Sequence, residues 1–325
     1  MNYLLNVDYL EFRASTEIHL NNFLSAGIYK FSNGLFLEMV KDYGFLKQTY
    51  SFCFKIRYKD DELGLFWAKS LDLSFENGFN TMVRIENKVF YVSVLGSVLK
   101  MIVETLGLRK TIIKRLDVCY DTDFDVLSCF KTLFYDASTK FKMRNKIKVK
   151  GTGRDDDELT IGSLKSRSKC ISIYNKTKEI NSNSHKEYIR NLHKEIFGLK
   201  TIYRVELKIM NRLLDVKNID LMSLGNNDYL ETIFNTYFDT LIQFEDLKSQ
   251  EKIEFITLNN TGKKIQKEKK QKCLGGGGKQ VKAMINFMDK ECKTSGFTGV
   301  RKDWKSVRSA LIKKYGLEAW YLMKK

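Results

Sequence analysis

Three segments of the chain alternate apolar and polar side chains with a period of two, and this pattern constrains the fold more than any other feature of the sequence. They cover residues 114–121, 169–176 and 202–209. Residues i and i+2 of a strand share a face, so each segment predicts a strand with an apolar face and a reactive polar face. The polar faces carry Arg115, Asp117, Cys119 and Asp121, then Ser172, Tyr174 and Lys176, then Arg204, Glu206 and Lys208.

Two of these strands repeat the same order, an arginine followed two residues later by a carboxylate. If the two strands are neighbours, Asp117 and Glu206 come within about 5 Å of each other. Like charges at that separation repel unless a cation lies between them, and oxygen ligands of this kind suit Mg²⁺ or Mn²⁺. Asp121 lies about 13–14 Å from Asp117 along an ideal strand, so a bulge or a strand end is needed to bring it to the same ion.

A turn rich in Lys, Arg and Ser precedes the segment that contains Tyr174. Its Lys165, Arg167 and Lys169 are suited to binding phosphate oxygens. A tyrosine beside Lys176 and near metal-binding carboxylates is a candidate nucleophile, because cations favour the phenolate and a metal polarises the phosphorus under attack. Each segment alone is more often an ordinary half-buried strand with a solvated face, and the recurrence of the pattern is what favours a functional site.

The first 245 residues predict an α+β body. Strand-like runs and amphipathic helical runs follow one another without strict βα alternation, which predicts a central antiparallel or mixed sheet with helices on one face. Besides the three segments above, strands are expected at 49–58, 63–69, 82–93 and 158–163, and helices at about 94–107, 124–139, 184–197 and 227–245.

The positive charge is concentrated at the C-terminal end. The chain has a net charge of +17, of which residues 246–325 carry +12, with 20 Lys and Arg against 8 Asp and Glu. Four consecutive glycines indicate a linker. We therefore predict a catalytic body at 1–245, a basic Gly-rich linker at 246–278 and a basic helical appendage at 279–325. The appendage is suited to DNA binding or partner docking, with a solvated hairpin packed on the body as the alternative; its expected DNA contacts are Lys279, Arg301, Lys305 and Arg308.

Composition excludes several classes of protein. Hydrophobic residues at 43% and aromatic residues at 13% are enough for a packed core. No run approaches the roughly 18 apolar residues of a membrane span, and the start lacks the features of a signal peptide, so no membrane association and a cytoplasmic location are expected. The six cysteines show no C-x-x-C spacing and the three histidines are scattered, which argues against a zinc knuckle or a disulfide framework.

The same residues, in this order, resemble the motifs of the rolling-circle replication initiation factors. That group covers the Rep-trans plasmid initiators, and the nickases of filamentous phages and some conjugative elements are similar. The resemblance spans about residues 110–210, and Val7 to Phe12 resemble the N-terminal strand of the family. The motifs are Arg115-Leu116-Asp117-x-x-x-Asp121, Ile161-Gly162-Ser163-x-x-Ser166, Ile173-Tyr174-Asn175-Lys176-x-x-Glu179 and Tyr203-Arg204-Val205-Glu206.

The resemblance implies a metal-dependent DNA strand transferase. Tyr174 would attack one phosphodiester at the origin of a replicon, form a 5′-phosphotyrosyl link, leave a free 3′-OH as primer, and later allow re-ligation. The carboxylates would hold Mg²⁺ or Mn²⁺, and the cations, with Lys178 close by, would contact the DNA. On matched positions the metal ligands are Asp117, Asp121 and Glu206, and the phosphate contacts are Arg115, Lys176 and Arg204. The expected partners are origin DNA, both duplex and single-stranded at the nick, with a host helicase and a second copy of the chain as further candidates.

Several alternatives stay open. Tyr188, on a helix-like segment, is a rival nucleophile, because related enzymes often place the tyrosine on a helix. The chain has no His-hydrophobic-His pair, and its acidic set resembles the Rep-trans branch instead. A conjugative relaxase would use the same chemistry, and a non-catalytic DNA-binding regulator would use none. An RNA-binding protein on an open sheet should show Phe or Tyr clusters with Gly on central strands, which Arg-x-Asp does not match.

Overall fold

A computed structural model describes most of the first 258 residues. The described residues are 2–16, 27–42, 44, 49–70, 79–142, 147–150, 158–164, 169–182, 186–210, 219–254, 256 and 258. Contacts between Cα atoms divide the chain into two units, and every described residue lies in the first, Met1–Gln266. Several predicted features fall outside the described residues: most of the linker, the whole appendage, and Lys165, Arg167, Lys279, Arg301, Lys305 and Arg308.

Strands dominate the described part of the chain. They are β1 (Tyr3–Ser15), β2 (Ile28–Lys30), β3 (Leu35–Met39), β4 (Tyr50–Tyr58), β5 (Asp61–Ser70), β6 (Thr81–Ile85), β7 (Arg109–Thr122), β8 (Thr139–Lys142), β9 (Ile147–Lys150), β10 (Glu158–Ser163), β11 (Lys169–Asn175), β12 (Tyr203–Met210), β13 (Gln243–Asp246) and β14 (Lys252–Ile253). The helices are α1 (Val89–Val92), α2 (Leu95–Thr105), α3 (Val126–Tyr135), α5 (Lys176–Asn181), α6 (Glu187–Phe197), α8 (Asn227–Phe238) and the 3₁₀ helix η5 (Met222–Gly225).

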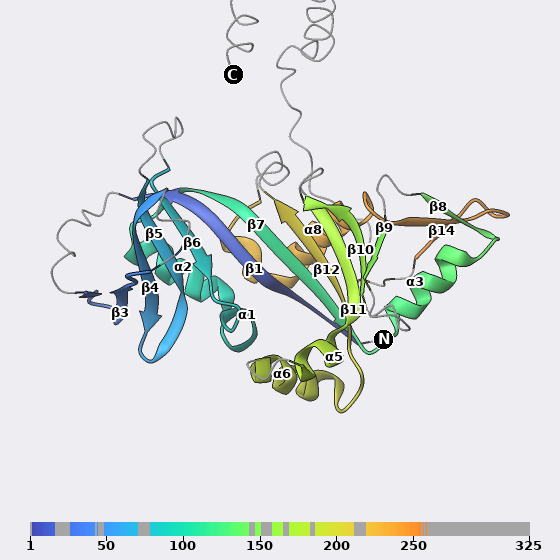
Figure 1. Ribbon diagram of the computed structural model, residues 1–325, viewed down its shortest axis with the longest axis horizontal. Coiled ribbons are helices and arrows are strands. Elements are labelled where there is room, and N and C mark those ends of the chain that lie inside the picture. The colour runs from blue at the N-terminus through green and yellow to red at the C-terminus, as the bar shows by residue number, and fades with distance from the viewer. Residues whose placement is uncertain are drawn as a thin grey trace, which may run out of the picture. The chain divides into compact units, whose positions relative to one another are not determined.

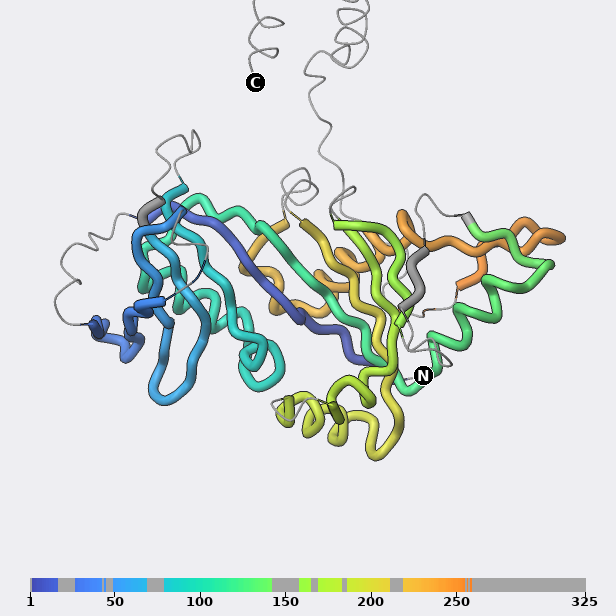
Figure 2. The backbone as a smooth tube through the Cα atoms, viewed as in Figure 1, coloured from blue at the N-terminus to red at the C-terminus, as the bar shows by residue number. Residues whose placement is uncertain are grey.

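Eleven strands form one antiparallel sheet, in the order β2-β3-β4-β5-β6-β1-β7-β12-β11-β10-β9. The long, twisted strands β1 and β7 cross the middle of this sheet (Figure 1; Figure 2). Strands β8, β13 and β14 form a second, three-stranded sheet. The predicted α+β class with an antiparallel sheet is therefore confirmed.

Helices α2, α3 and α8 cover one face of the large sheet (Figure 1). Their apolar side chains, such as Leu99, Phe130 and Ile233, join one core cluster with strand residues such as Val118 and Val205. On the opposite face, α5 and α6 lie at one end of the central strands (Figure 1), and α1 places Tyr91 against Arg204. Helices α5 and α6 lie outside the predicted layer, which was expected on one face only. On this second face, His193 of α6 contacts Asp121.

Two predicted elements end earlier than the sequence pattern suggested. The expected strand 82–93 stops at Ile85, and Val89, Phe90 and Tyr91 form a helical turn that buries all three side chains. The expected helix 227–245 ends at Phe238, and the chain then enters β13. Apolar runs of this length do not by themselves distinguish a strand from a buried helix. The compact body also continues past residue 245, since Ile256 and Leu258 belong to its core. No helix in the described part of the chain is long and apolar enough to span a membrane.

Among the glycines that the structure describes, Gly64 leaves the least room for a side chain, and we predict that Gly64→Ala destabilises the protein. A Cβ atom there would lie 2.2 Å from the Arg84 carbonyl oxygen on β6. Because a backbone atom cannot move away as a side chain can, the expected loss is about 3 kcal/mol or more of unfolding free energy, measured by urea denaturation. Gly107→Ala is the control: a Cβ atom there meets nothing within 4 Å, so only the left-handed backbone, about 1–2 kcal/mol, opposes it. Equal losses at the two positions would contradict the steric argument.

Candidate active site

The three strands that the sequence singled out are adjacent in the sheet, in the order β7-β12-β11. The predicted pairing of β7 with β12 is confirmed, but its register is displaced by two residues from the one that would place Asp117 directly opposite Glu206. Glu206 lies opposite Cys119, and Asp117 lies opposite Lys208, so the two carboxylates are diagonal neighbours rather than a direct pair. Tyr174 on β11 lies opposite Arg204 on β12. One continuous polar surface therefore runs across the three strands.

Arg204 is buried completely and its contacts are all internal. Its Nε and Nη2 atoms each donate to a different oxygen of Asp121 at 2.6 Å. Nη1 donates to Asp8 Oδ1 at 2.7 Å, and Nη2 also donates to the Tyr91 hydroxyl at 2.9 Å. The prediction that Arg204 steadies a DNA phosphate is therefore not supported, because its side chain has no surface left for a ligand.

Asp121 is held by two cationic or potentially cationic groups. His193 Nε2 on α6 lies 2.8 Å from Asp121 Oδ2, and the carboxylate has no exposed surface. Although burial alone would raise the pKa of Asp121, Arg204 and then His193 lower it to about 2. The same balance applies to Asp8, whose pKa is lowered by Arg204 and Lys176 despite its burial. Both carboxylates are therefore charged and oriented.

Arg115 and Asp117 form a second guanidinium–carboxylate pair beside the first. Arg115 Nε and Nη2 donate to the two oxygens of Asp117 at 3.0 and 2.6 Å, and the guanidinium stacks 4.3 Å from the centre of the Tyr9 ring. Burial raises the pKa of Asp117 to about 6, with nearby Glu206 adding to the rise and Arg115 opposing it. Neither residue lines the cleft that contains Tyr174.

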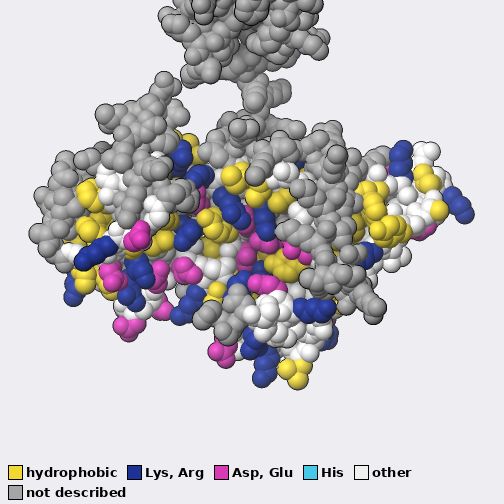
Figure 3. Space-filling view, viewed as in Figure 1, with side chains coloured by type: hydrophobic (Ala, Val, Ile, Leu, Met, Phe, Trp, Pro, Cys, Tyr) yellow, Lys and Arg dark blue, Asp and Glu magenta, His cyan; other side chains and the backbone are white. Residues whose placement is uncertain are grey.

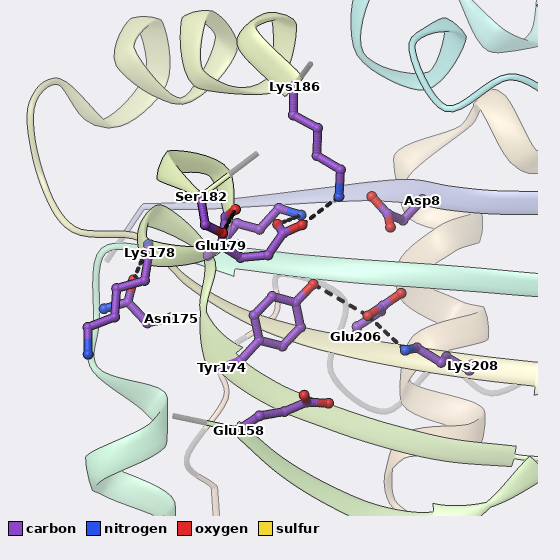
Figure 4. A pocket seen from close by; sticks show the side chains of 11 residues that line it. Asp8, Glu158, Tyr174, Asn175, Lys178, Glu179, Ser182, Lys186, Glu206 and Lys208 are labelled. Carbon is purple, nitrogen blue, oxygen red and sulfur yellow. Dashed lines mark hydrogen bonds and ion pairs between the residues drawn. The ribbon is translucent and has the colours of Figure 1, made fainter. Parts of the chain in front are cut away.

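Tyr174 faces a cleft of about 480 Å³ at the end of β11 (Figure 4). On the sheet face seen in Figure 3, acidic and basic side chains lie side by side over the central strands. The cleft combines four ammonium groups, four carboxylates and three neutral polar side chains. The lysines are Lys176, Lys178, Lys186 and Lys208, the acids are Asp8, Glu158, Glu179 and Glu206, and the neutral residues are Tyr174, Asn175 and Ser182.

The Tyr174 hydroxyl donates to Glu206 Oε2 at 3.4 Å, and Lys208 Nζ lies 3.1 Å from the same oxygen. Burial raises the pKa of Tyr174 well above the usual value for a phenol; Arg204 opposes this rise and Glu206 adds to it. The cation Arg204 does favour the phenolate, as expected, but burial outweighs it and the group stays a phenol. A base must take its proton before it can act as a nucleophile, and the Glu206 carboxylate is in contact with it.

The residues after Tyr174 form a tight strand-to-helix turn. Asn175 caps α5 by accepting a hydrogen bond from the Lys178 amide at 2.9 Å. Lys176 then points back into the cleft, with its ammonium 5.8 Å from the centre of the Tyr174 ring and 2.6 Å from Glu179. Lys186 reaches the other oxygen of Glu179, also at 2.6 Å. The Tyr-Asn-Lys-x-x-Glu pattern thus has a local structural reason: a tyrosine at the cleft, a helix cap and an i,i+3 ion pair.

The rival tyrosine lies outside the cleft. Tyr188 donates to Asn87 Oδ1 at 2.7 Å and packs against the Tyr91 ring at 5.8 Å between centroids. Of the predicted DNA contacts, Lys178 is exposed at the cleft. Lys169 instead hydrogen-bonds Thr240 and lies 6.0 Å from the centre of the Tyr237 ring, on the helix-covered side. Lys169 is therefore placed away from the cleft.

Of the predicted metal ligands, Asp117 and Glu206 are diagonal neighbours, but β7 pairs with β12 without the bulge that would bring Asp121 to the same ion. Both oxygens of Asp117 and both of Asp121 bind guanidinium groups, and only Glu206 faces the cleft. Among the residues that the structure describes, no group of three or more His, Cys, Asp or Glu side chains is arranged to hold a metal ion. This arrangement does not fit the predicted three-carboxylate site, so a requirement for Mg²⁺ or Mn²⁺ stays a prediction of the resemblance.

Sequence reasoning missed several residues of the cleft. Glu179 lay within a recognised motif, and the alternation in 202–209 already placed Lys208 on the same face as Glu206, but neither residue was given a role at the site. Asp8 lay within the N-terminal strand that the resemblance included, but nothing marked it, because it sits at a break in the β1–β7 register. Lys186, which lines the cleft, and His193, which binds Asp121 outside it, come from the region of α6, and no periodicity connects this region to the strands.

Comparisons of the sequence with known proteins found no relative, whereas comparison of the fold with solved structures found similar chains. No family model matches the chain, and no curated protein matches it. Among solved structures, the rolling circle replication initiator protein from Geobacillus stearothermophilus is similar, with 13% sequence identity and a TM-score of 0.43 over 82% of this chain and 93% of that one.

We predict that Arg204→Met lowers the unfolding free energy by about 3–5 kcal/mol, because it leaves the buried Asp121 and Asp8 without their counter-ion. Arg57→Met is the matched control: Arg57 pairs with Glu38 at the surface, where both side chains are about a third exposed, and a loss below about 1 kcal/mol is expected. Urea denaturation of the two variants measures the difference. Similar losses would show that the buried network does not carry the stability assigned to it.

Asp117 should make stability depend on pH. Its pKa is about 6 in the folded protein against 3.8 for the free side chain, so the folded state binds more protons between these values and stability falls as pH rises from 4 to 6. Asp117→Asn should remove a fall of roughly 3 kcal/mol across that window. The unfolding free energy of the variant minus that of the wild type, at several pH values, measures it. The exposed Asp60→Asn provides the control, and a flat difference for Asp117→Asn would refute the assignment.

Proposed function

We propose that this protein nicks one strand of DNA at the origin of a replicon and starts rolling-circle replication. The observation that carries the proposal is the Tyr174 hydroxyl in contact with the Glu206 carboxylate, inside a cleft that also presents four lysines. A phenol, a base in contact with it and cations for a polyanion are the groups that phosphodiester transfer to tyrosine needs. The motif resemblance, which selects the same tyrosine, supports the assignment.

In the proposed reaction the Tyr174 oxygen attacks the phosphorus of one phosphodiester while Glu206 accepts the phenolic proton. The bond between phosphorus and O3′ breaks, and the leaving oxygen takes a proton from solvent to become a free 3′-OH. The new phosphotyrosyl bond conserves the energy of the broken phosphodiester. Reversal, with a 3′-OH as the nucleophile, therefore re-ligates the strand without a nucleotide cofactor.

The lysines supply the charge that this step requires. The Lys176 side chain is only 1% exposed and its ammonium lies over the Tyr174 ring. It can therefore stabilise negative charge on the phenolic oxygen and on the phosphate under attack. Burial and Arg204 lower the pKa of Lys176, while Asp8 and Glu179 oppose that shift. Arg204 acts as a positioning residue for Asp8 and β12, and Arg115 does the same for Asp117.

A divalent ion belongs to the proposal as a prediction of the resemblance. Bound near the scissile phosphate, Mg²⁺ or Mn²⁺ would act as a Lewis acid on the phosphate oxygens. Asp8 and Glu206, the carboxylates that face the cleft from β1 and β12, are the residues of this chain best placed to contribute to such a site. Origin DNA is the proposed partner, in duplex form and as a single strand at the nick. A helicase partner, a dimer and a cytoplasmic location remain predictions.

The experiment uses supercoiled DNA of the replicon that carries the gene. Purified protein is incubated with this DNA and Mn²⁺ or Mg²⁺, and a denaturing gel is examined for a protein–DNA adduct. The wild type should form the adduct, Tyr174→Phe should not, and Glu206→Gln should slow its formation by about 10²–10⁴-fold, the usual contribution of a general base. Addition of EDTA tests the metal requirement separately.

Tyr188→Phe is the matched control and should form the adduct at nearly the wild-type rate, because its hydroxyl contacts Asn87 outside the cleft. An adduct that survives Tyr174→Phe but not Tyr188→Phe would move the nucleophile to α6. DNA binding without an adduct on this DNA would favour the non-catalytic regulator. Adduct formation on a transfer origin alone would identify a conjugative relaxase.

A further inference from the structure

The cleft contains one carboxylate that two lysines hold from different elements. Glu179 Oε2 lies 2.6 Å from Lys176 Nζ on α5, and Glu179 Oε1 lies 2.6 Å from Lys186 Nζ, just before α6. The Glu179 and Lys186 side chains are 32% and 29% exposed, whereas Lys176 is buried. Figure 4 shows Glu179 and Lys186 on the same side of the cleft, across from the Tyr174 ring.

The charges that line the cleft balance, with four lysines against four carboxylates. A balanced cleft has no excess positive charge to attract a polyanion, and phosphate neutralisation supplies most of the affinity for nucleic acid. Release of lysines from one of the carboxylates when DNA binds would supply that positive charge. Glu179 is the acid whose displacement frees two ammonium groups together. The described contacts of the other three are with Lys208 and Tyr174 for Glu206, Arg204 and Tyr91 for Asp8, and Thr160 for Glu158.

We propose that the Glu179 carboxylate occupies a phosphate-binding site, formed by Lys176 and Lys186. In the complex this site holds a backbone phosphate of the single strand, next to the phosphate that Tyr174 attacks. When the strand enters, a phosphate replaces the Glu179 carboxylate between Lys176 and Lys186, and Glu179 turns toward solvent. A carboxylate and a phosphate both offer two oxygens to a pair of ammonium groups, so the exchange keeps both lysines paired. The inference deepens the proposed function, on which it rests, and assigns Lys186 as a DNA contact and Glu179 as a displaceable counter-ion.

This arrangement has a consequence for selectivity. Buried Lys176 keeps a partner in both states, so the free protein avoids an unpaired buried charge. An anion must displace the Glu179 carboxylate to bind between the two lysines, and a single small anion competes poorly with it. A nucleic acid strand does so because its other phosphates bind elsewhere, including at the exposed Lys178. The phosphate-binding site therefore favours a nucleic acid strand over isolated anions.

The test measures binding rather than cleavage, in a Tyr174→Phe background. The probe is a fluorescent oligothymidylate of about 12 nucleotides, a length within the usual single-strand site size. Removal of the competing carboxylate by Glu179→Gln should tighten binding about tenfold. Removal of one phosphate contact by Lys186→Gln should weaken binding and reduce the slope of log affinity against log salt by about 0.7. Glu195→Gln, an exposed charge change on α6, is the matched control and should do neither.

Weaker binding by Glu179→Gln, or an unchanged salt slope for Lys186→Gln, would overturn the proposal, because Glu179 would then only orient Lys176. Circular dichroism and urea denaturation confirm that each variant is folded. The outcome is separable from that of the proposed function. If the wild type forms the adduct while these variants bind DNA normally, only the proposed phosphate-binding site is refuted. If the variants change binding as expected but no adduct forms, only the proposed nicking reaction is refuted.

Discussion

The buried guanidinium of Arg204 is the contact on which the arrangement of the cleft depends. It joins β12 to Asp121 on β7, to Asp8 on β1 and to Tyr91 on α1. Such a cluster is costly to bury, and it persists only when every charge and hydrogen-bonding group finds a partner in a fixed geometry. That requirement fixes three strands and a helix relative to one another. Asp8 and Glu206, which face Tyr174, gain their positions from it.

Burial divides the polar residues of the central strands into two groups. Arg204, Asp121 and Asp117 are almost completely buried, with Arg204 bound to Asp121 and Arg115 bound to Asp117, so they organise the site without reaching a ligand. Tyr174, Lys208 and Glu179 are partly exposed at the cleft. Alternation along a strand predicts only which side chains share a face. It does not predict which part of that face other elements of the fold cover. Here α6 covers the part that contains Asp121.

Local patterns explain which parts of the fold could be predicted. The alternation in 114–121, 169–176 and 202–209 correctly indicated β7, β11 and β12, because period-2 patterning follows directly from strand geometry. The Asn175 cap and the Lys176–Glu179 pair are local contacts too. The roles of Arg115 and Arg204 were beyond reach, since an arginine two residues from a carboxylate can bind a phosphate or another carboxylate. The partner was decided by strand register and by helices distant in sequence.

The long separations within the Arg204 network bear on how the protein is made. Arg204 and Asp8 are 196 residues apart, and Arg204 and Asp121 are 83 apart. Antiparallel neighbours such as β4 and β5 can pair soon after they leave the ribosome. The contacts of Arg204 close much larger loops, which carries a greater entropic cost, and they cannot form before β12 has been synthesised. Such long-range contacts slow folding. A nascent chain therefore has no complete cleft, and whatever this cleft binds meets a finished site only after Tyr203–Met210 has left the ribosome and paired.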